Sequence, residues 1–100
     1  MAMGQDQREK ALDSLRGCSP FRSANSALSA AYGCQGTGKL DHEYKADAES
    51  AGYVVYSYET PIAWIRQDGT RVMPSARYSQ VTAQHKGIVR QAWAGRVREI

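Results

Sequence analysis

Apolar residues recur at helical spacing in the first part of the chain. Within residues 5–16, Ala11, Leu12 and Leu15 lie along one side of a helix. Gly17 follows them at a position where helices commonly end. We therefore predict a short amphipathic helix over residues 5–16.

A second segment, residues 19–33, repeats this arrangement of polar and apolar residues. Ser19 occupies the capping position, Pro20 the first helical position and Gly33 the position after the last turn. We expect a second short helix that packs on the first as an N-terminal helical hairpin. Residues 41–50 alternate charges without a wide apolar face, so they are expected to form a weak, exposed helix or an ordered loop.

The middle of the chain changes to the pattern of β-strands. Residues 53–58, YVVYSY, are rich in β-branched and aromatic residues. Pro61 cannot donate a backbone hydrogen bond, so it indicates a sheet edge or a bend. Asp68 and Gly69 then separate two further strand-like runs. This dipeptide favours a two-residue hairpin turn, because the type I′ turn needs positive φ at both central positions.

Helical spacing returns in the last part of the chain. Val81, His85, Ile88 and Ala92 recur on one face of a helix. Gly95 follows near the expected end of this helix, and the remaining RVREI is expected to form a short tail or a final turn.

These elements predict an α+β fold in a single small domain over residues 1–100. The expected architecture is the N-terminal helical hairpin, a small antiparallel β-sheet at about 53–73, and a C-terminal helix at about 80–93 packed on the sheet. Residues 1–38 would form the helical N-terminal part, and residues 52–95 the hairpin and helix.

The expected hairpin register creates a candidate binding face. With a two-residue turn, Arg66 pairs with Arg71 and Trp64 with Met73, and all four side chains share one face. Opposed arginines repel unless an anion lies near them, and Arg beside Trp is common at binding hot spots and can stack on bases. The structural alternative is that Trp64 and Met73 cap the edge of the core while the arginine stems reach water.

The predicted C-terminal helix adds a second basic set. Lys86 and Arg90 are four residues apart and therefore neighbours on one helical face. His85 lies on the apolar face, where we expect its nitrogens to be satisfied within the core. Its alternatives are a pH switch, a partner contact or a catalytic role.

Charge is unevenly distributed along the 100 residues, whose formal net charge is +3. Residues 60–100 hold seven Lys and Arg against two Asp and Glu, whereas residues 1–59 hold six against eight. A basic half permits nucleic acid or an acidic protein as partner, and its alternative is a solubilising surface.

Apolar patterning argues against membrane insertion and secretion. The longest apolar runs have four or five residues, and crossing a bilayer takes roughly 20. The N-terminus lacks the apolar segment of a signal peptide. We expect no membrane partner and a cytoplasmic location.

The cysteines and histidines do not indicate a metal site or a cofactor. Cys18, Cys34, His42 and His85 match no compact zinc-ligand spacing. Without a signal peptide, the two cysteines are expected to be reduced thiols, and a disulfide between two helix ends is the alternative.

Catalytic motifs are equally absent from the sequence. Ser57, Ser79, His85 and Asp68 can be combined into a Ser/His/Asp set, but such sets arise by chance in a chain rich in hydroxyls. The glycine-rich residues 33–39, GCQGTGK, lack the spacing of a phosphate-binding loop. We therefore do not expect an enzyme.

Two motifs, YVVYSYETPIAW and YSQVTAQHKGIVRQA, together resemble small proteins encoded by phages of actinobacteria, over about residues 53–93. Those proteins share a pattern of the form YSYxTPIAW, a turn, a proline and then YSxxTxxHxxxVR. The matching residues are Tyr56, Ser57, Tyr58, Thr60, Pro61, Ile62, Ala63, Trp64, Pro74, Tyr78, Ser79, Thr82, His85, Val89 and Arg90. The resemblance implies a phage setting, and in the host a cytoplasmic one, rather than a mechanism.

The first functional hypothesis is a small non-enzymatic binding module that contacts nucleic acid through its basic C-terminal half. The residues expected to make this contact are Trp64, Arg66, Arg71, Met73, Lys86 and Arg90. The alternative is a protein-interaction module in which the same face binds a host or phage protein, with inhibition as one outcome. An unrecognised enzyme is the third hypothesis, and a second copy of the chain, paired through a sheet edge, is a further candidate partner.

Overall fold

The computed structural model describes residues 5–22, 28–75 and 80–100. Within these ranges three helices and six strands follow one another along the chain. They are α1 (Gln5–Arg16), β1 (Phe21–Arg22), β2 (Leu28–Tyr32), α2 (His42–Glu49), β3 (Tyr53–Ser57), β4 (Thr60–Ile65), β5 (Arg71–Met73), α3 (Gln80–Ala92) and β6 (Arg98–Glu99). Among these helices, none is long and apolar enough to cross a membrane.

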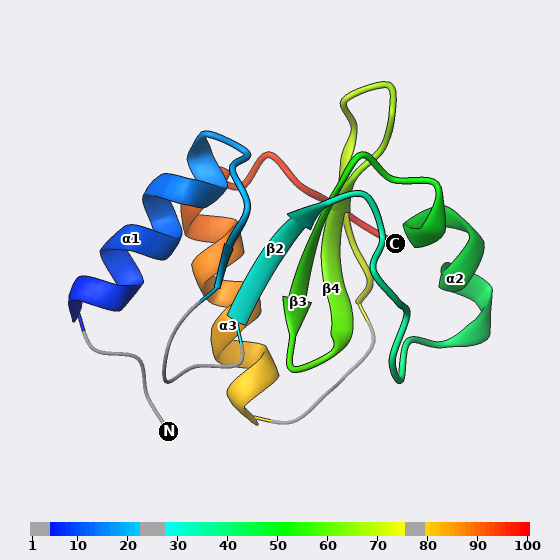
Figure 1. Ribbon diagram of the computed structural model, residues 1–100, viewed down its shortest axis with the longest axis horizontal. Helices are drawn as coiled ribbons and strands as arrows, with labels where there is room; N and C mark the ends of the chain where they lie inside the picture. The colour runs from blue at the N-terminus through cyan, green and yellow to red at the C-terminus, as the bar shows by residue number, and fades with distance from the viewer. Residues whose placement is uncertain (1–4, 23–27, 76–79) are drawn as a thin grey trace.

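All six strands form one mixed sheet in the order β1-β2-β3-β4-β5-β6. Neighbouring strands are antiparallel except β5 and β6, which are parallel. Helices α1 and α3 cover one face of the sheet and α2 covers the other (Figure 1). The fold is therefore α+β in three layers, with the helices interspersed among the strands.

The predicted N-terminal helical hairpin is wrong. Helix α1 lies where its apolar stripe indicated, but the second segment forms β1 and β2 instead of a helix. Along β2, Leu28 and Ala30 are buried while Ser29 and Ala31 are half-buried, which is the two-residue period of a strand. The pairing of β2 with β3 over five residues therefore outweighs the local sequence signals that favour a helix in this segment.

The sheet is also larger than the expected sheet at 53–73. It gains β1 and β2 on one side and, on the other, β6, which comes from the expected C-terminal tail. Helix α3 spans Gln80–Ala92, close to the predicted bounds. After α3, Gly95 adopts a φ of 74°, and its N–H donates to the Arg90 carbonyl. This glycine cap turns the chain back toward β5.

The β4–β5 hairpin has a three-residue loop, so the expected register is wrong by one residue. The Arg66 N–H donates to the Thr70 carbonyl at 2.8 Å, and the Gly69 N–H to the Arg66 carbonyl at 2.9 Å. Gly69 has a φ of 91°, as in a turn followed by a glycine bulge. Trp64 therefore pairs with Val72. A one-residue shift moves every side chain of one strand to the opposite face.

Pro61 lies inside β4, next to an irregularity, rather than at an outer edge of the sheet. Val55 pairs with Ala63 and Tyr56 pairs with Pro61, so Ile62 is the extra residue of a bulge. The missing N–H of Pro61 is tolerated there because the regular ladder is already interrupted. The tight turn that joins β3 to β4 comes directly before this bulge in the chain.

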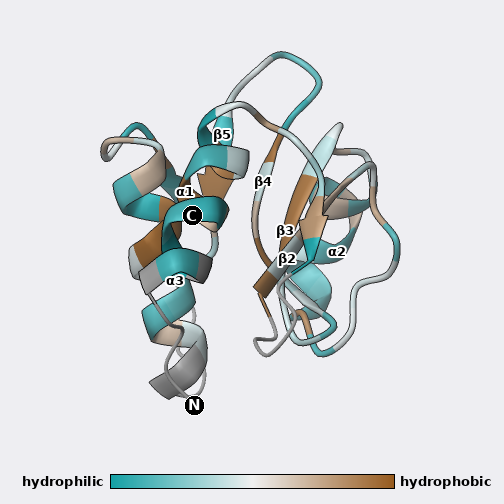
Figure 2. Cartoon of the chain, turned by 60° about the vertical axis from the view of Figure 1, so that its left-hand side comes forward, coloured by the Kyte–Doolittle hydropathy of each residue, from teal (hydrophilic) through white to brown (hydrophobic). Residues whose placement is uncertain are grey.

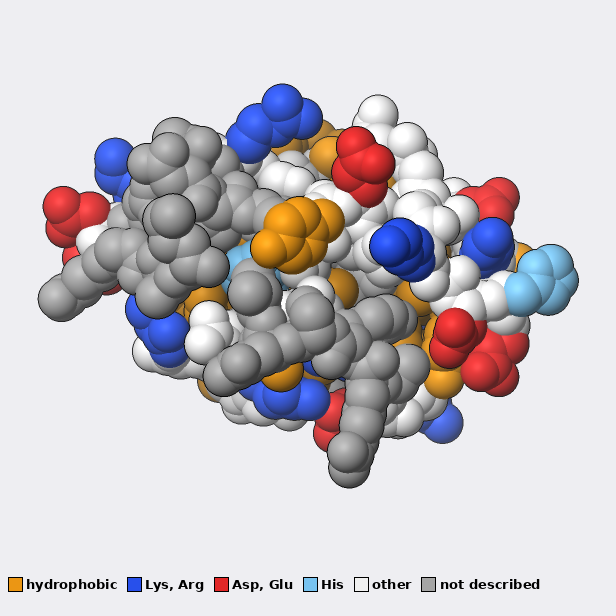
Figure 3. Space-filling view, turned by 90° about the horizontal axis from the view of Figure 1, so that it is seen from below, with side chains coloured by type: hydrophobic (Ala, Val, Ile, Leu, Met, Phe, Trp, Pro, Cys, Tyr) orange, Lys and Arg blue, Asp and Glu red, His pale blue; other side chains and the backbone are white. Residues whose placement is uncertain are grey.

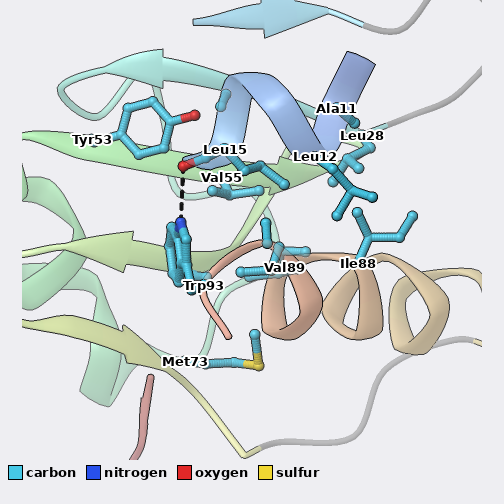
Figure 4. Close-up of a cluster of buried hydrophobic side chains, with 14 residues drawn as sticks. Ala11, Leu12, Leu15, Leu28, Tyr53, Val55, Met73, Ile88, Val89 and Trp93 are labelled. Atoms are coloured by element: carbon cyan, nitrogen blue, oxygen red, sulfur yellow. Dashed lines mark hydrogen bonds between the residues drawn. The ribbon is translucent and has the colours of Figure 1, made fainter. Parts of the chain in front are cut away.

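Two hydrophobic clusters fill the spaces between the layers, where the hydrophobic residues gather (Figure 2). The larger cluster lies between the sheet and helices α1 and α3. It contains Ala11, Leu12, Leu15, Leu28, Ala30, Tyr53, Val55, Ile62, Ala63, Met73, Ile88, Val89, Ala92 and Trp93 (Figure 4). The smaller cluster lies beneath α2 and contains Leu40, Ala48, Ala51, Val54, Tyr56, Trp64 and Val72.

Candidate functional site

The predicted Trp-Arg face is divided between the two sides of the sheet. Trp64 is 0% exposed and belongs to the cluster beneath α2. Arg66 lies on the same side, where its Nε donates to Asp47 Oδ1 at 3.0 Å and its Nη2 to Oδ2 at 2.7 Å. These hydrogen bonds raise the pKa of Arg66. Its charge is therefore matched by a carboxylate of α2.

The other two members of that face lie beneath α1 and α3. Met73 is fully buried in the larger cluster. The guanidinium carbon of Arg71 lies 5.6 Å from the ring centroid of Trp93, a cation–π distance. The opposed-arginine pair predicted for the hairpin is not formed, because Arg71 pairs with Ile65.

The two basic residues expected on α3 have partners within the fold. Lys86 is buried, and its Nζ donates to the Pro74 carbonyl. Burial lowers the pKa of Lys86. Arg90 donates through Nη2 to Glu99 Oε1 at 2.6 Å. The six residues proposed for nucleic-acid contact are thus not gathered on one surface.

A different set of residues meets at the end of β3. Ser57 continues the row of Tyr53 and Val55, which faces α1 and α3. Its Oγ lies 2.7 Å from His85 Nδ1 and 3.0 Å from Thr82 Oγ1. These three buried residues form what we call the hydroxyl–imidazole cluster.

Helix α3 supplies two members of this cluster because of its spacing. Thr82, His85, Val89 and Ala92 recur at intervals of three and four residues and are all buried. Burial lowers the pKa of His85 below its ordinary value of 6.5. The imidazole is therefore neutral at pH 7, and one of its nitrogens is a hydrogen-bond acceptor.

An open hollow of about 720 Å³ lies over the hydroxyl–imidazole cluster. Its described lining consists of Gly38, Lys39, Ser57, Tyr58, Glu59, Thr60 and Thr82. The loop at Gly38 packs tightly on the β3–β4 turn, since a Cβ at this glycine would overlap the Glu59 carbonyl oxygen. The Lys39 N–H also donates to Thr60 Oγ1 at 3.0 Å. Two loops distant in sequence therefore build one rim.

Tyr58 stands at this rim in a strained conformation. Its φ is 59°, in the left-handed region that is a genuine outlier for a bulky residue. The side chain is 60% exposed. Tyr58 and Glu59 also border a second hollow of about 440 Å³, lined in addition by Phe21, Arg22, Ser29, Ala30, Ala31, Gln35, Gly36 and Tyr56. The β3–β4 turn therefore separates the two hollows.

Charges on this end of the molecule are mixed. Seen from below, acidic and basic side chains are interspersed, and the described residues in view form no continuous basic band (Figure 3). Lys39 and Glu59 line the first hollow, and Arg22 and Glu59 line the second.

Ser57 and His85 both belong to the Ser/His/Asp set that the sequence allows and that was attributed to chance. The resemblance pattern also contains Ser57, Thr82 and His85. Two further residues of the pattern, Tyr78 and Ser79, lie outside the described residues, as does the side chain of Val81. Both cysteines are free, so the alternative of a disulfide is wrong.

Residues 12–93 match a family of unknown function, DUF8033, and the chain belongs to this family. The match includes the β3–β4 turn and the hydroxyl–imidazole cluster. No curated protein and no solved structure matches the chain.

Proposed function

We propose that the protein is a binding module that recognises a protein partner through the surface around Tyr58. The observation that carries this proposal is the strained, exposed tyrosine at the β3–β4 turn. A left-handed conformation costs a non-glycine residue on the order of 1 kcal/mol. Such strain is concentrated at functional sites, and tyrosine combines a large apolar ring with a polar tip that suits protein interfaces.

The two hollows beside Tyr58 support a protein partner. Because Tyr58 and Glu59 border both hollows, a partner can contact the turn from two sides. The linings combine aromatic, hydroxyl and oppositely charged groups, the mixture found at the rims of protein interfaces.

Nucleic-acid binding has less support from the geometry. Phosphate contacts rely on accessible cations, whereas Arg66 and Arg90 are engaged by Asp47 and Glu99. The indole of Trp64 cannot stack on bases while it is buried. The phage setting implied by the resemblance is part of the same proposal, with a host or phage protein in the cytoplasm as the expected partner.

Site-specific crosslinking tests the proposal. A photoreactive phenylalanine analogue at position 58 should give a defined crosslinked protein in host cells. The same analogue at position 32 is the matched control, because Tyr32 is 63% exposed but lies at the opposite end of β2 and β3. Equal crosslinking at both positions would argue against a specific surface at the turn.

The variant Tyr58→Gly separates binding from folding. Glycine adopts positive φ without strain, and this gain offsets the entropy that glycine adds to the unfolded chain, so the stability of the variant should stay within about 1 kcal/mol of the wild type. It should nevertheless lose the crosslinked partner from pull-downs, whereas Tyr32→Ala should retain it. Full partner capture by Tyr58→Gly would contradict the proposal.

Gel-shift assays with labelled DNA and RNA at low salt provide the competing test. The proposed protein-binding module should leave their migration unchanged. A shift that weakens steeply with added salt would favour the nucleic-acid hypothesis instead.

A further inference from the structure

The hydroxyl–imidazole cluster has a geometry that partner binding does not require. We propose that Ser57 is a nucleophile, that His85 is its general base, and that the 720 Å³ hollow accepts a small carboxylic ester whose acyl group is transferred to Ser57. This activity goes beyond the proposed binding function. It corresponds to the third hypothesis from the sequence, an unrecognised enzyme.

The first requirement is a base within hydrogen-bond reach of the nucleophile. Ser57 Oγ and His85 Nδ1 are 2.7 Å apart, within the range of nucleophile–base pairs. With its pKa lowered by burial, His85 is neutral at pH 7 and can accept the serine proton. A serine hydroxyl otherwise remains protonated at this pH, so the imidazole supplies the activation.

Thr82 fixes the direction of this hydrogen-bond chain. A serine hydroxyl carries one proton, so when Ser57 donates to His85, Thr82 is the donor in the 3.0 Å contact with Ser57. In the state that the proposal requires, Thr82 donates to Ser57 and the serine proton points to the imidazole. Thr82 acts here as a positioning residue.

The electrostatic potential at the start of α3 also favours negative charge at Ser57. Thr82 lies in the first turn of α3, which begins at Gln80. The positive end of the helix dipole is therefore next to Ser57 Oγ. Positive potential of this kind stabilises the negative charge that develops when an alkoxide attacks a carbonyl carbon.

Access to Ser57 limits the class of substrate. The residue lines the hollow but is only 2% exposed. A short acyl group reaches the oxygen more easily than a bulky one, since Tyr58 and Thr60 border the same space. Small esters are therefore the expected substrates.

The reaction balances without a cofactor or an oxidant. Ser57 Oγ forms a bond to the carbonyl carbon of the ester while its proton moves to His85 Nδ1. The bond between that carbon and the alcohol oxygen then breaks, and the alcohol leaves with the proton from His85. Water, activated by the neutral imidazole, hydrolyses the acyl-serine to the carboxylic acid and regenerates the hydroxyl.

Incubation of the purified full chain with p-nitrophenyl acetate tests this proposal. We expect acetylation of Ser57, mapped by peptide mass spectrometry, together with release of nitrophenolate. Ser57→Ala should abolish this site of acetylation. The matched control is Ser50→Ala, which removes an exposed serine that directly follows α2 and should leave acetylation of Ser57 unchanged.

His85→Gln should slow acetylation of Ser57 on the order of a hundred-fold, the usual effect of losing a general base. The wild-type rate should fall as the pH drops, with a midpoint below 6.5, because protonation removes the acceptor nitrogen. This pH profile also serves as the test if His85→Gln does not fold. Acetylation of Ser57 no faster than that of the exposed Ser50, or independent of both His85 and pH, would overturn the proposal while leaving the crosslinking result untouched.

Discussion

The two faces of the central sheet differ in how they are covered. Helices α1 and α3 close one face over the larger cluster, whereas α2, with eight residues, closes part of the other over the smaller cluster. The second hollow lies beside the uncovered part of that face, where Ser29, Ala31 and Tyr56 contribute to its lining. The side beneath α1 and α3 thus holds the larger buried cluster, and the side beneath α2 leaves part of the sheet open at the second hollow.

The two tryptophans, one on each face of the sheet, illustrate this difference. On the α1 and α3 side, the Trp93 indole N–H donates to the Leu15 carbonyl at 3.0 Å and joins the end of α3 to α1 (Figure 4). On the α2 side, Trp64 is fully buried, and its indole N–H has no hydrogen-bond partner within the described part of the chain. A buried donor without a partner costs free energy of about 1–3 kcal/mol.

The largest effect is expected from Leu15→Ala on the well-covered face. Leu15 is fully buried in the larger cluster, so the substitution should lower the free energy of unfolding by about 3 kcal/mol through lost transfer energy and a residual cavity. The control on the opposite face is Tyr44→Ala, since Tyr44 of α2 is only half-buried. Chemical denaturation of both variants measures the difference, and equal losses would contradict the unequal division of stability.

A smaller effect should separate the two tryptophans. Trp93→Phe removes a hydrogen bond and leaves the Leu15 carbonyl without that donor, so it should destabilise the fold by about 1–2 kcal/mol. Trp64→Phe removes an unpaired buried donor, which offsets part of the cost of the lost ring, so its net effect should stay below about 1 kcal/mol. Chemical denaturation of both variants measures the two losses in free energy of unfolding, and a larger loss for Trp64→Phe would contradict this prediction.

The smallest effect is expected from the ion pair between Asp47 of α2 and Arg66, the residue that follows β4. Asp47→Ala removes the hydrogen bonds from Arg66 and should increase amide hydrogen exchange in α2 several-fold, with little change in α1 and α3. Glu99→Ala is the matched control because it breaks the more exposed pair with Arg90 and leaves α2 intact. Equal exchange of α2 in both variants would show that Asp47 does not secure this helix.

Local patterns in the sequence were sufficient to predict several helices and strands. The apolar stripe located α1, the spacing around His85 located α3, and the β-branched run located β3. Each of these signals depends on residues close together along the chain, where the helix or strand period directly determines which side chains are buried. Residues 42–49 proved helical even though their apolar face is narrow.

The remaining features depend on contacts between distant segments, and only the tertiary structure decided them. Segment 28–32 became a strand because β3 pairs with it. The Asp68-Gly69 signal is compatible with a two-residue or a three-residue loop, and the choice of the longer loop placed Trp64 and Met73 on opposite faces. Ser57 and His85 are 28 residues apart and meet because a strand end lies beside the first turns of α3. Chain-local periodicity specifies elements, whereas strand pairing and helix packing specify which side chains share a face or a site.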